Sequence, residues 1–301
     1  MDFTFTADQL ALATAVDGLA SQFKDKPIDF RGFALVDANL DQQLAEAEFF
    51  DITTTPGLGP VAAALTVERL ARLPYTAEVA LSMLVRPHIA GGQLPRPLAF
   101  VERGRPARFL ANAKSVLISD AGKLGFAQLT AADVEPVESI YAYPMGRLVK
   151  PISTTPLSAA EANEARKWLR VALAAEAAGL MQAAIDSTVE HLSVRKQFGR
   201  PLGSFQALRH RMAECAVLAG GVKLLTLKAA STANEGDAAL AAFHAQESAA
   251  RIAYDLHQFL GAMGMTLEHS LHLWTYRLKL LISELGGQSA QAQAVAQHCF
   301  G

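Results

Sequence analysis

The chain has only two cysteines in 301 residues and no excess of either charge. Cys215 falls within an apolar helical pattern and Cys299 near the end of the sequence, so neither a disulfide framework nor a cysteine-based zinc site can be drawn. Lys and Arg number 27 and Asp and Glu 29, which leaves no basic face broad enough for nucleic acid or an anionic membrane surface. Small molecules or other proteins are the expected partners.

The sequence also lacks recognisable targeting and nucleotide-binding signatures. Its opening, MDFTFTADQLAL, has acidic residues where a signal peptide carries positive charge. No window approaches the roughly 20 uncharged apolar residues of a membrane span, and neither a Rossmann glycine fingerprint nor a P-loop occurs. These absences predict a soluble, cytoplasmic protein with no membrane partner.

What is present is mainly a helical pattern, in three parts. Apolar residues recur at helical spacing over residues 7–23 and 58–73, which predicts a shortened N-terminal helical domain over residues 1–86. Between 87 and 156, prolines and glycines separate short apolar runs, which predicts a reduced β domain. Four long helical segments in 157–301, the last over about 266–285, predict a C-terminal four-helix bundle. The expected fold class is therefore mainly α with a small β domain.

One stretch, VRKQFGRPLGSFQ at residues 194–206, has an unusual combination of residues at the end of a helical segment. Cations there favour the helix dipole, Gly199 suits a C-cap, Pro201 prevents the helix from continuing, and Ser204 suits the next N-cap. A helical hairpin alone would account for most of this pattern. It leaves the arginine, glutamine and phenylalanine unexplained as a set.

A second stretch, DLHQFLGAMGMTLEH at residues 255–269, predicts a helix that ends in a glycine turn and restarts with Glu268 in its first turn. A glycine turn permits close approach of a ligand to the backbone, and Gln258 offers both hydrogen-bond donors and acceptors beside it.

Together the two stretches resemble motifs of the acyl-CoA dehydrogenase family. Arg-x-Gln-Phe-Gly-x-Pro-Leu-x-x-Phe-Gln corresponds to residues 195–206, and Gln-x-x-Gly-Gly-x-Gly to residues 258–264, where Ala262 replaces a glycine. The opening and the order of helices, β region and four-helix bundle also resemble that family. Neither the family's Thr-Glu-Pro and Gly-Ser-Asp signature nor its Trp-containing strand beside the flavin ring is found between 87 and 156. The chain therefore looks most like a reduced subunit of a heteromeric acyl-CoA dehydrogenase of the steroid or bulky acyl-CoA type.

The resemblance implies FAD at a subunit interface. Arg195, Gln197, Phe198 and Gln206 would meet its pyrophosphate and adenosine part, while Gln258 and Gly261 would meet the FAD of a neighbouring subunit. Charge-assisted bonds from a guanidinium to a pyrophosphate are about twice as strong as neutral ones. The implied reaction converts an acyl-CoA thioester into a trans-2-enoyl-CoA, with electron-transfer flavoprotein as acceptor.

The resemblance places no confident catalytic base on this chain. Family members carry a glutamate at the position of Leu169 or in a loop at the position of Leu285 or Gly286. Glu284 is one or two residues out of register and is the candidate on this chain, and Glu176 lies further along the first bundle helix. Because a positioned base contributes about 10²- to 10⁴-fold, a related chain in a heterotetramer would supply it. A homo-oligomer and a flavin-free subunit that only stabilises an active partner remain alternatives.

Four further features of the sequence have a possible functional meaning. Arg170 would either neutralise an acyl-CoA or flavin group or pair with a carboxylate in the bundle. Trp274, Tyr276 and Arg277 fit core and interface packing. Glu268, His269 and His272 lack a further ligand at suitable spacing, so no metal is expected. The Ser-x-x-Lys pattern at 193–196 lacks its companion motifs.

Overall fold

The computed structural model describes residues 4–24, 33 and 35–301, so the first three residues of the opening motif lie outside the described residues. Nine helices are described: α1 Ala7–Lys24, α2 Ala38–Glu46, α3 Gly59–Ala71, α4 Ala80–Leu84, α5 Ala159–Val194, α6 Gln206–Thr232, α7 Glu235–Leu260, α8 His272–Leu281 and α9 Gly287–Phe300. The described strands are β1 Leu98–Glu102, β2 Ala107–Arg108, β3 Ser115–Asp120, β4 Lys123–Gln128, β5 Val134–Val137, β6 Met145–Leu148, β7 Thr155–Pro156, β8 Lys196–Gln197 and β9 Arg200–Pro201.

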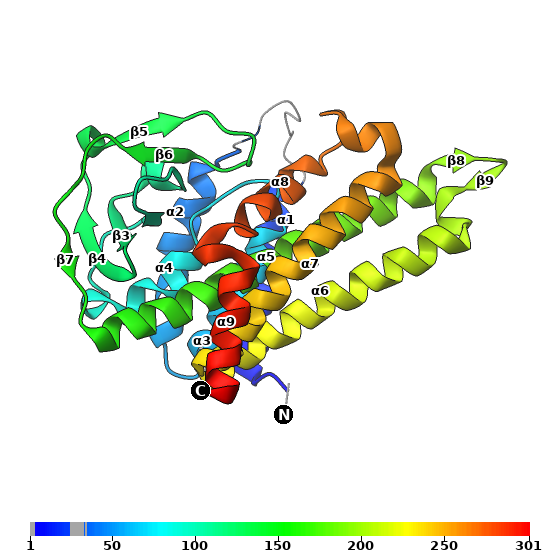
Figure 1. The fold of residues 1–301 in the computed structure, drawn as a ribbon. Helices are drawn as coiled ribbons and strands as arrows, with labels where there is room; N and C mark the ends of the chain where they lie inside the picture. Colours follow the sequence, from blue (N-terminus) through cyan, green and yellow to red (C-terminus); the bar gives the residue numbers. More distant parts are fainter. Residues whose placement is uncertain (1–3, 25–32, 34) are drawn as a thin grey trace.

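The architecture confirms the expected fold class of N-terminal helices, a small β region and a C-terminal bundle (Figure 1). Four strands form one sheet in the order β1-β3-β4-β7, in which only the β1–β3 pair is parallel. Three more form an antiparallel sheet in the order β2-β6-β5. The N-terminal helices share one apolar core with the bundle, while the β region has a small core of its own.

The central helix α5 positions the N-terminal helices, the β region and the hairpin relative to one another. Its start is fixed by a capping box, in which Ser158 and Glu161 satisfy each other's backbone N–H groups. Alanines keep its sides small, and Gly179 lets α3 approach so closely that a Cβ there would lie 2.0 Å from the carbonyl oxygen of Glu68. With 36 residues, α5 is about 54 Å long. It therefore runs from the β region at one end of the molecule to the β8–β9 hairpin at the other (Figure 1).

The C-terminal part differs from the expected pattern in two places. The fourth bundle helix, α8, begins at His272 rather than near residue 266, because the backbone over Gly261–Met265 forms a 3-10 turn, η7. Glu268 therefore precedes the helix instead of lying in its first turn. A further helix, α9, follows the Gly286–Gly287 pair and packs against α7. Its apolar positions are mostly alanine, which gives too weak a periodic signal to predict it.

Among the described helices, α5 and α6 each contain a window of 18 residues that has at most two charged residues and is apolar enough to cross a membrane. The window of α5 is 89% buried, as expected of the core helix of a bundle. The window of α6 is only 39% buried, and Val217 and Leu224 on it are exposed. Helix α6 thus presents an apolar face with no partner in the single chain.

Candidate functional site

The first motif forms a hairpin at the far end of α5. The helix ends at Val194, and Lys196–Gln197 pairs in antiparallel fashion with Arg200–Pro201. Phe198 and Gly199 make the two-residue turn, both with positive φ (55° and 78°), which is the backbone twist that a tight hairpin of this type requires. The helical interpretation was thus wrong in detail. Gly199 is a turn residue rather than a C-cap, and Ser204 lies in a 3-10 turn, so that Phe205 is the N-cap of α6.

The hairpin presents the motif side chains to solvent. Arg195, Gln197 and Phe198 are all exposed, Phe198 to 86%. Among the described residues, Arg195 and Gln197 make no side-chain hydrogen bond or ion pair. The Phe198 and Phe205 rings meet edge to face, with centroids 6.0 Å apart. A guanidinium, an amide and an aromatic ring are thus exposed together on and beside the hairpin.

The second motif lies at the same end of the bundle. Helix α7 ends at Leu260, and Gly261 (φ 60°, ψ −134°) turns the chain in a conformation that favours glycine. Gln258 and Gly261 are exposed and line an open cavity of about 640 Å³ between α7 and α8. Ala262, the departure from the family motif, lines the same cavity without obstructing Gly261. The end of α5 reaches this segment through His191 and His269, whose rings meet edge to face at 5.6 Å.

Gln206 has a side-chain partner on α6. Its Nε2 lies 3.4 Å from Nε2 of His210, one turn further along α6. Both side chains are exposed, so this contact leaves the amide oxygen of Gln206 available.

The two positions expected for a base come together at the opposite end of α5. Leu169, Leu285 and Gly286 line one cavity of about 260 Å³ between β1, the start of α5 and the loop before α9. Glu102 is the carboxylate among the described residues that line this cavity, and Nη1 of Arg105 binds it at 2.7 Å. The fold therefore places both alternative positions against one space, and neither carries a carboxylate in this chain.

Glu284 lies next to this cavity but belongs to a buried ion cluster. Its Oε1 accepts a hydrogen bond from Nε of Arg108 at 2.8 Å, and Nη1 of the same arginine binds Oε2 of Glu176 at 2.5 Å. The hydroxyl of Tyr143 donates to Oε1 of Glu176 at 2.7 Å. The sequence placed Glu176 on an uncertain face of α5; the structure turns it inward. Both candidate carboxylates are therefore bound to one arginine.

Arg277 lies on the side of this cluster that faces the N-terminal helices. Its guanidinium is buried and donates to the backbone carbonyls of Leu73, Pro74 and Ala142. Its carbon lies 5.8 Å from the centre of the Tyr143 ring. The cluster, defined here as Arg108, Tyr143, Glu176, Arg277 and Glu284, joins the N-terminal helices, the β region and the bundle. It contains two cations and two carboxylates, so its formal charge is balanced.

Burial and ion pairing set the pKa values of this cluster. Burial alone would disfavour the Arg108 cation, but the carboxylates of Glu176 and Glu284 outweigh it and hold the pKa of Arg108 well above its usual value. Burial raises the pKa of Glu284, and Arg108 offsets this only in part. Burial and the nearby Glu176 raise the pKa of Tyr143, and burial lowers the pKa of Arg277 to about 10.

Arg170 has bundle partners in the single chain. Its Nε donates to Oε1 of Gln291 at 2.8 Å, and its Nη1 lies 3.2 Å from Oε1 of Glu235. Gln291 in turn donates to the backbone carbonyl of Leu285 at 2.7 Å. Of the two interpretations left open by the sequence, these contacts favour pairing within the bundle. Arg170 still lines the cavity with Leu169, so its role toward a ligand stays a prediction.

The sequence did not predict a role for Arg108 or Tyr143. It predicted only packing for Arg277, which belongs to the ion cluster. Arg108 lies in a two-residue strand within a proline-rich region, where no periodic pattern marks which side chains are buried. The available signal was Glu176 itself, because a carboxylate on an alanine-rich core helix requires a buried cation. Trp274 and Arg277 do belong to the buried interior, as expected, and Trp274 Nε1 donates to the carbonyl of Arg72 at 3.1 Å.

Comparison with known proteins agrees with this arrangement. Residues 160–299 match the family described as "Acyl-CoA dehydrogenase, C-terminal domain". The chain is 32% identical over 213 residues to the acyl-CoA dehydrogenase FadE34 of Mycobacterium tuberculosis, a match that covers 66% of this chain and 30% of FadE34. It spans less than half the length of the other curated relatives it matches most strongly. Residues 160–299 of the chain are thus an acyl-CoA dehydrogenase C-terminal domain.

Solved structures show the same fold over nearly the whole chain. A chain of the ChsE4-ChsE5 complex from Mycobacterium tuberculosis superposes with a TM-score of 0.80 at 19% identity, covering 99% of both chains. A chain of a structure titled "Tcur3481-Tcur3483 steroid ACAD G363A variant" gives a TM-score of 0.77 at 20% identity, covering 96% of this chain and 97% of the other. The extent of these matches confirms that the fold is that of the acyl-CoA dehydrogenases.

Proposed function

We propose that this chain is a subunit of a two-chain, FAD-dependent acyl-CoA dehydrogenase, in which it grips the nucleotide half of a shared FAD and a related chain supplies the base. The reaction removes a proton from the carbon α to a thioester and a hydride from the β carbon, and FAD supplies the hydride acceptor. The names of FadE34 and of the two-chain complexes above support this class of reaction. Electron-transfer flavoprotein is the proposed acceptor.

The observation that carries the proposal is the distance between the two halves of the site. Arg195 lies 26 residues beyond Leu169 on the same helix, which is about 39 Å at 1.5 Å per residue. That separation supports a FAD that is held by the hairpin of this chain and has its ring in another chain, rather than in the cavity beside Leu169.

The hairpin and the turn after α7 fit the adenosine and pyrophosphate half of FAD. Arg195 has free guanidinium donors for phosphate oxygens, Phe198 offers an exposed apolar ring, and Gln258 can bond to a ribose or a base edge. Gly261 exposes backbone beside Gln258. The exposed Val217 and Leu224 in the middle of α6 support a protein partner along this helix, since single chains rarely leave large apolar faces uncovered.

The cavity beside Leu169 supports assigning the base to the partner. Both positions at which the family resemblance expects a glutamate are apolar or glycine here, and Glu284 is bound to the buried Arg108. Arg108 lowers the basicity that burial alone would give Glu284, and its hydrogen bond occupies one oxygen of that carboxylate. This same observation favours the second candidate function, a flavin-free subunit that stabilises an active partner.

The FAD content of the purified complex tests the proposal. The chain would be purified alone and after co-expression with an acyl-CoA dehydrogenase chain encoded beside it, and FAD counted per chain from its visible absorbance. We expect flavin only in the complex, and about tenfold weaker FAD binding in the complex that carries Arg195→Ala. Arg209→Ala, which removes an exposed arginine at the start of α6, is the matched control and should leave FAD binding unchanged.

Two outcomes would overturn the proposal. Full dehydrogenase activity with stoichiometric FAD in the lone chain would refute the two-chain arrangement. If the Arg195→Ala and Arg209→Ala complexes bind FAD with equal affinity, the proposed contact between Arg195 and FAD is refuted. The function would then be that of a flavin-free subunit.

A further inference from the structure

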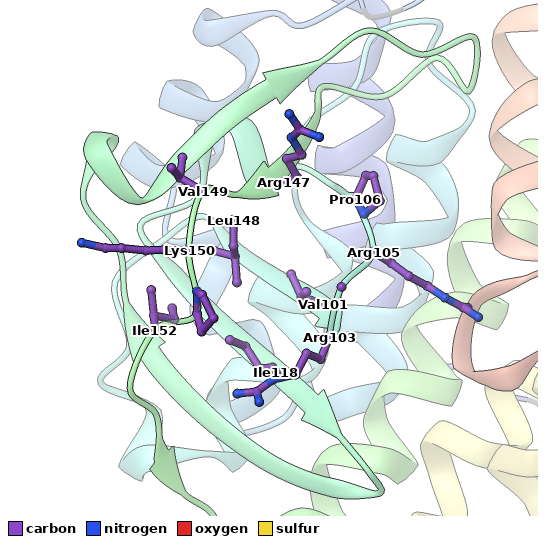
Figure 2. A pocket seen from close by; sticks show the side chains of 12 residues that line it. Val101, Arg103, Arg105, Pro106, Ile118, Arg147, Leu148, Val149, Lys150 and Ile152 are labelled. Carbon is purple, nitrogen blue, oxygen red and sulfur yellow. The ribbon is translucent and has the colours of Figure 1, made fainter.

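A cavity in the β region lies apart from the site described above. It has a volume of about 320 Å³ and opens between the turn that follows β1 and the segment that follows β6 (Figure 2). Successive side chains of a strand point to opposite faces of the sheet. Phe100 accordingly packs toward the main core, while Val101 belongs to the separate core of the β region. The cavity is therefore on the face of β1 opposite to the bundle, and it needs neither FAD nor a partner chain.

The centre of this cavity is aliphatic. Val101 and Ile118 are paired across β1 and β3, so their side chains share one face, and Leu148 and Ile152 approach from the other side. Figure 2 shows these side chains gathered at the centre. Among the described lining residues there is neither an aromatic ring for stacking nor a side-chain amide or hydroxyl for reading a base edge. The lining therefore suits an aliphatic or alicyclic body and does not suit a nucleotide.

The edge of the cavity is cationic. Arg103, Arg105, Arg147 and Lys150 line it, and within the described part of the chain no acidic residue does. This gathering of positive charge contrasts with the net charge of −2 of the whole chain. In Figure 2 the four side chains spread outward from the apolar centre in different directions.

These cations remain available to a ligand. The arginines pair with Asp120, Glu102 and Glu135, which lie outside the lining, and all three arginine side chains are more than half exposed. Exposed ion pairs contribute about 0–1 kcal/mol, and each guanidinium has five N–H donors, so an anion can recruit them at little cost. Lys150 makes no ion pair among the described residues.

We propose that this cavity binds a small molecule with an aliphatic or alicyclic body and one anionic head group, a carboxylate or a phosphate monoester. The body occupies the space between the two sheets, and the head group lies at the mouth against Lys150. A volume of about 320 Å³ is at the lower end of the range for small-molecule sites.

Equilibrium dialysis of the purified chain with labelled decanoate, decyl phosphate and decanol tests this proposal. We expect saturable binding of one anion per chain, weakened by salt, with decanol bound at least tenfold more weakly. Comparing decanoate with decyl phosphate identifies the preferred head group. Lys150→Glu should weaken anion binding about tenfold, and Lys123→Glu, on the exposed surface of β4 away from the cavity, should not.

A second variant tests the body of the ligand. Leu148→Trp should fill the space between the sheets and remove binding of either anion, while circular dichroism reports whether the fold is kept. The proposal is overturned if neither anion binds saturably to the folded chain, if decanol binds as well as the anions, or if Lys150→Glu and Lys123→Glu bind alike. None of these outcomes depends on FAD, so failure here leaves the proposed dehydrogenase function untouched.

Discussion

Replacing Arg108 by methionine should destabilise the protein through the two carboxylates that it leaves behind. Arg108 is 5% exposed and binds Glu176 at 2.5 Å and Glu284 at 2.8 Å. Methionine matches the length of the arginine stem, so the packing loss is small and the main change is electrostatic. Removing one partner of a buried ion pair costs about 3–5 kcal/mol, because the remaining charge stays buried without compensation.

This cost is measurable by thermal unfolding. At roughly 2 °C per kcal/mol for a chain of this size, the expected loss in Tm at neutral pH is about 6–10 °C. Arg103→Met is the matched control, since it removes an arginine of the same region whose ion pair with Asp120 at 2.9 Å is about half exposed. The control should change stability by no more than about 1 kcal/mol.

The pH dependence identifies the mechanism. Burial already raises the pKa of Glu284 above its usual 4.5, and loss of Arg108 removes the charge that opposes this, so the variant's pKa rises further. A raised pKa in the folded state favours the protonated form. The variant should therefore regain stability relative to the wild type as the pH falls from 7 toward 5, and lose it again as the pH rises through the raised pKa.

Arg108→Met combined with Glu176→Gln and Glu284→Gln should recover most of the lost Tm, because the two carboxylates that Arg108 leaves behind are then neutral, while Arg277 keeps its hydrogen bonds to backbone carbonyls. The reasoning about the cluster is refuted if Arg108→Met is as stable as Arg103→Met, or if its deficit does not shrink at lower pH.

Two further predictions concern packing and titration. Gly179→Ala should lower the free energy of unfolding, measured in urea, by about 1–3 kcal/mol, because its Cβ would lie 2.0 Å from the Glu68 carbonyl oxygen. Gly220→Ala, with open space around it, should raise the free energy of unfolding by about 0.5–1 kcal/mol. Equal effects of the two substitutions would disprove the close α3–α5 contact. Burial lowers the pKa of His257, whose Nδ1 lies 2.5 Å from the Gly264 carbonyl oxygen, so its contribution is present above pH 6.5 and is lost as the pH falls through the lowered pKa. His257→Gln should therefore flatten the stability curve between pH 7 and 5, and an unchanged curve would contradict this.

The helices of the bundle could be predicted because their signals are local. Apolar residues at helical spacing marked α5, α6 and α7. Helix α9 could not be found in this way, since alanine contributes little to an apolar face. The hairpin was misjudged because a glycine after a helical segment usually indicates a C-cap, whereas here Phe198 adopts positive φ as well and makes a turn.

Some residues of the candidate site could also be predicted from local sequence, and others could not. The exposed residues Arg195, Gln197 and Phe198 form a contiguous motif, so the sequence sufficed to propose their role. Arg108, Tyr143, Glu176 and Arg277 come from segments up to 169 residues apart, Arg108 to Arg277, and no local pattern connects them. Their meeting depends on three separate contacts of α5 and α8 with the N-terminal helices and the β region.

The amino-acid sequence by itself determined the long helices, the family resemblance and the two exposed motifs, because helical periodicity and short motifs are encoded within a few consecutive turns of chain. Only the tertiary structure decided that Glu284 is bound to Arg108, that Leu169 and Leu285 face one cavity, and that the hairpin lies about 39 Å along α5 from that cavity. Burial and distance are properties of the packed chain. A carboxylate's partner, and thus its availability for chemistry, follows from which distant segments fold against it.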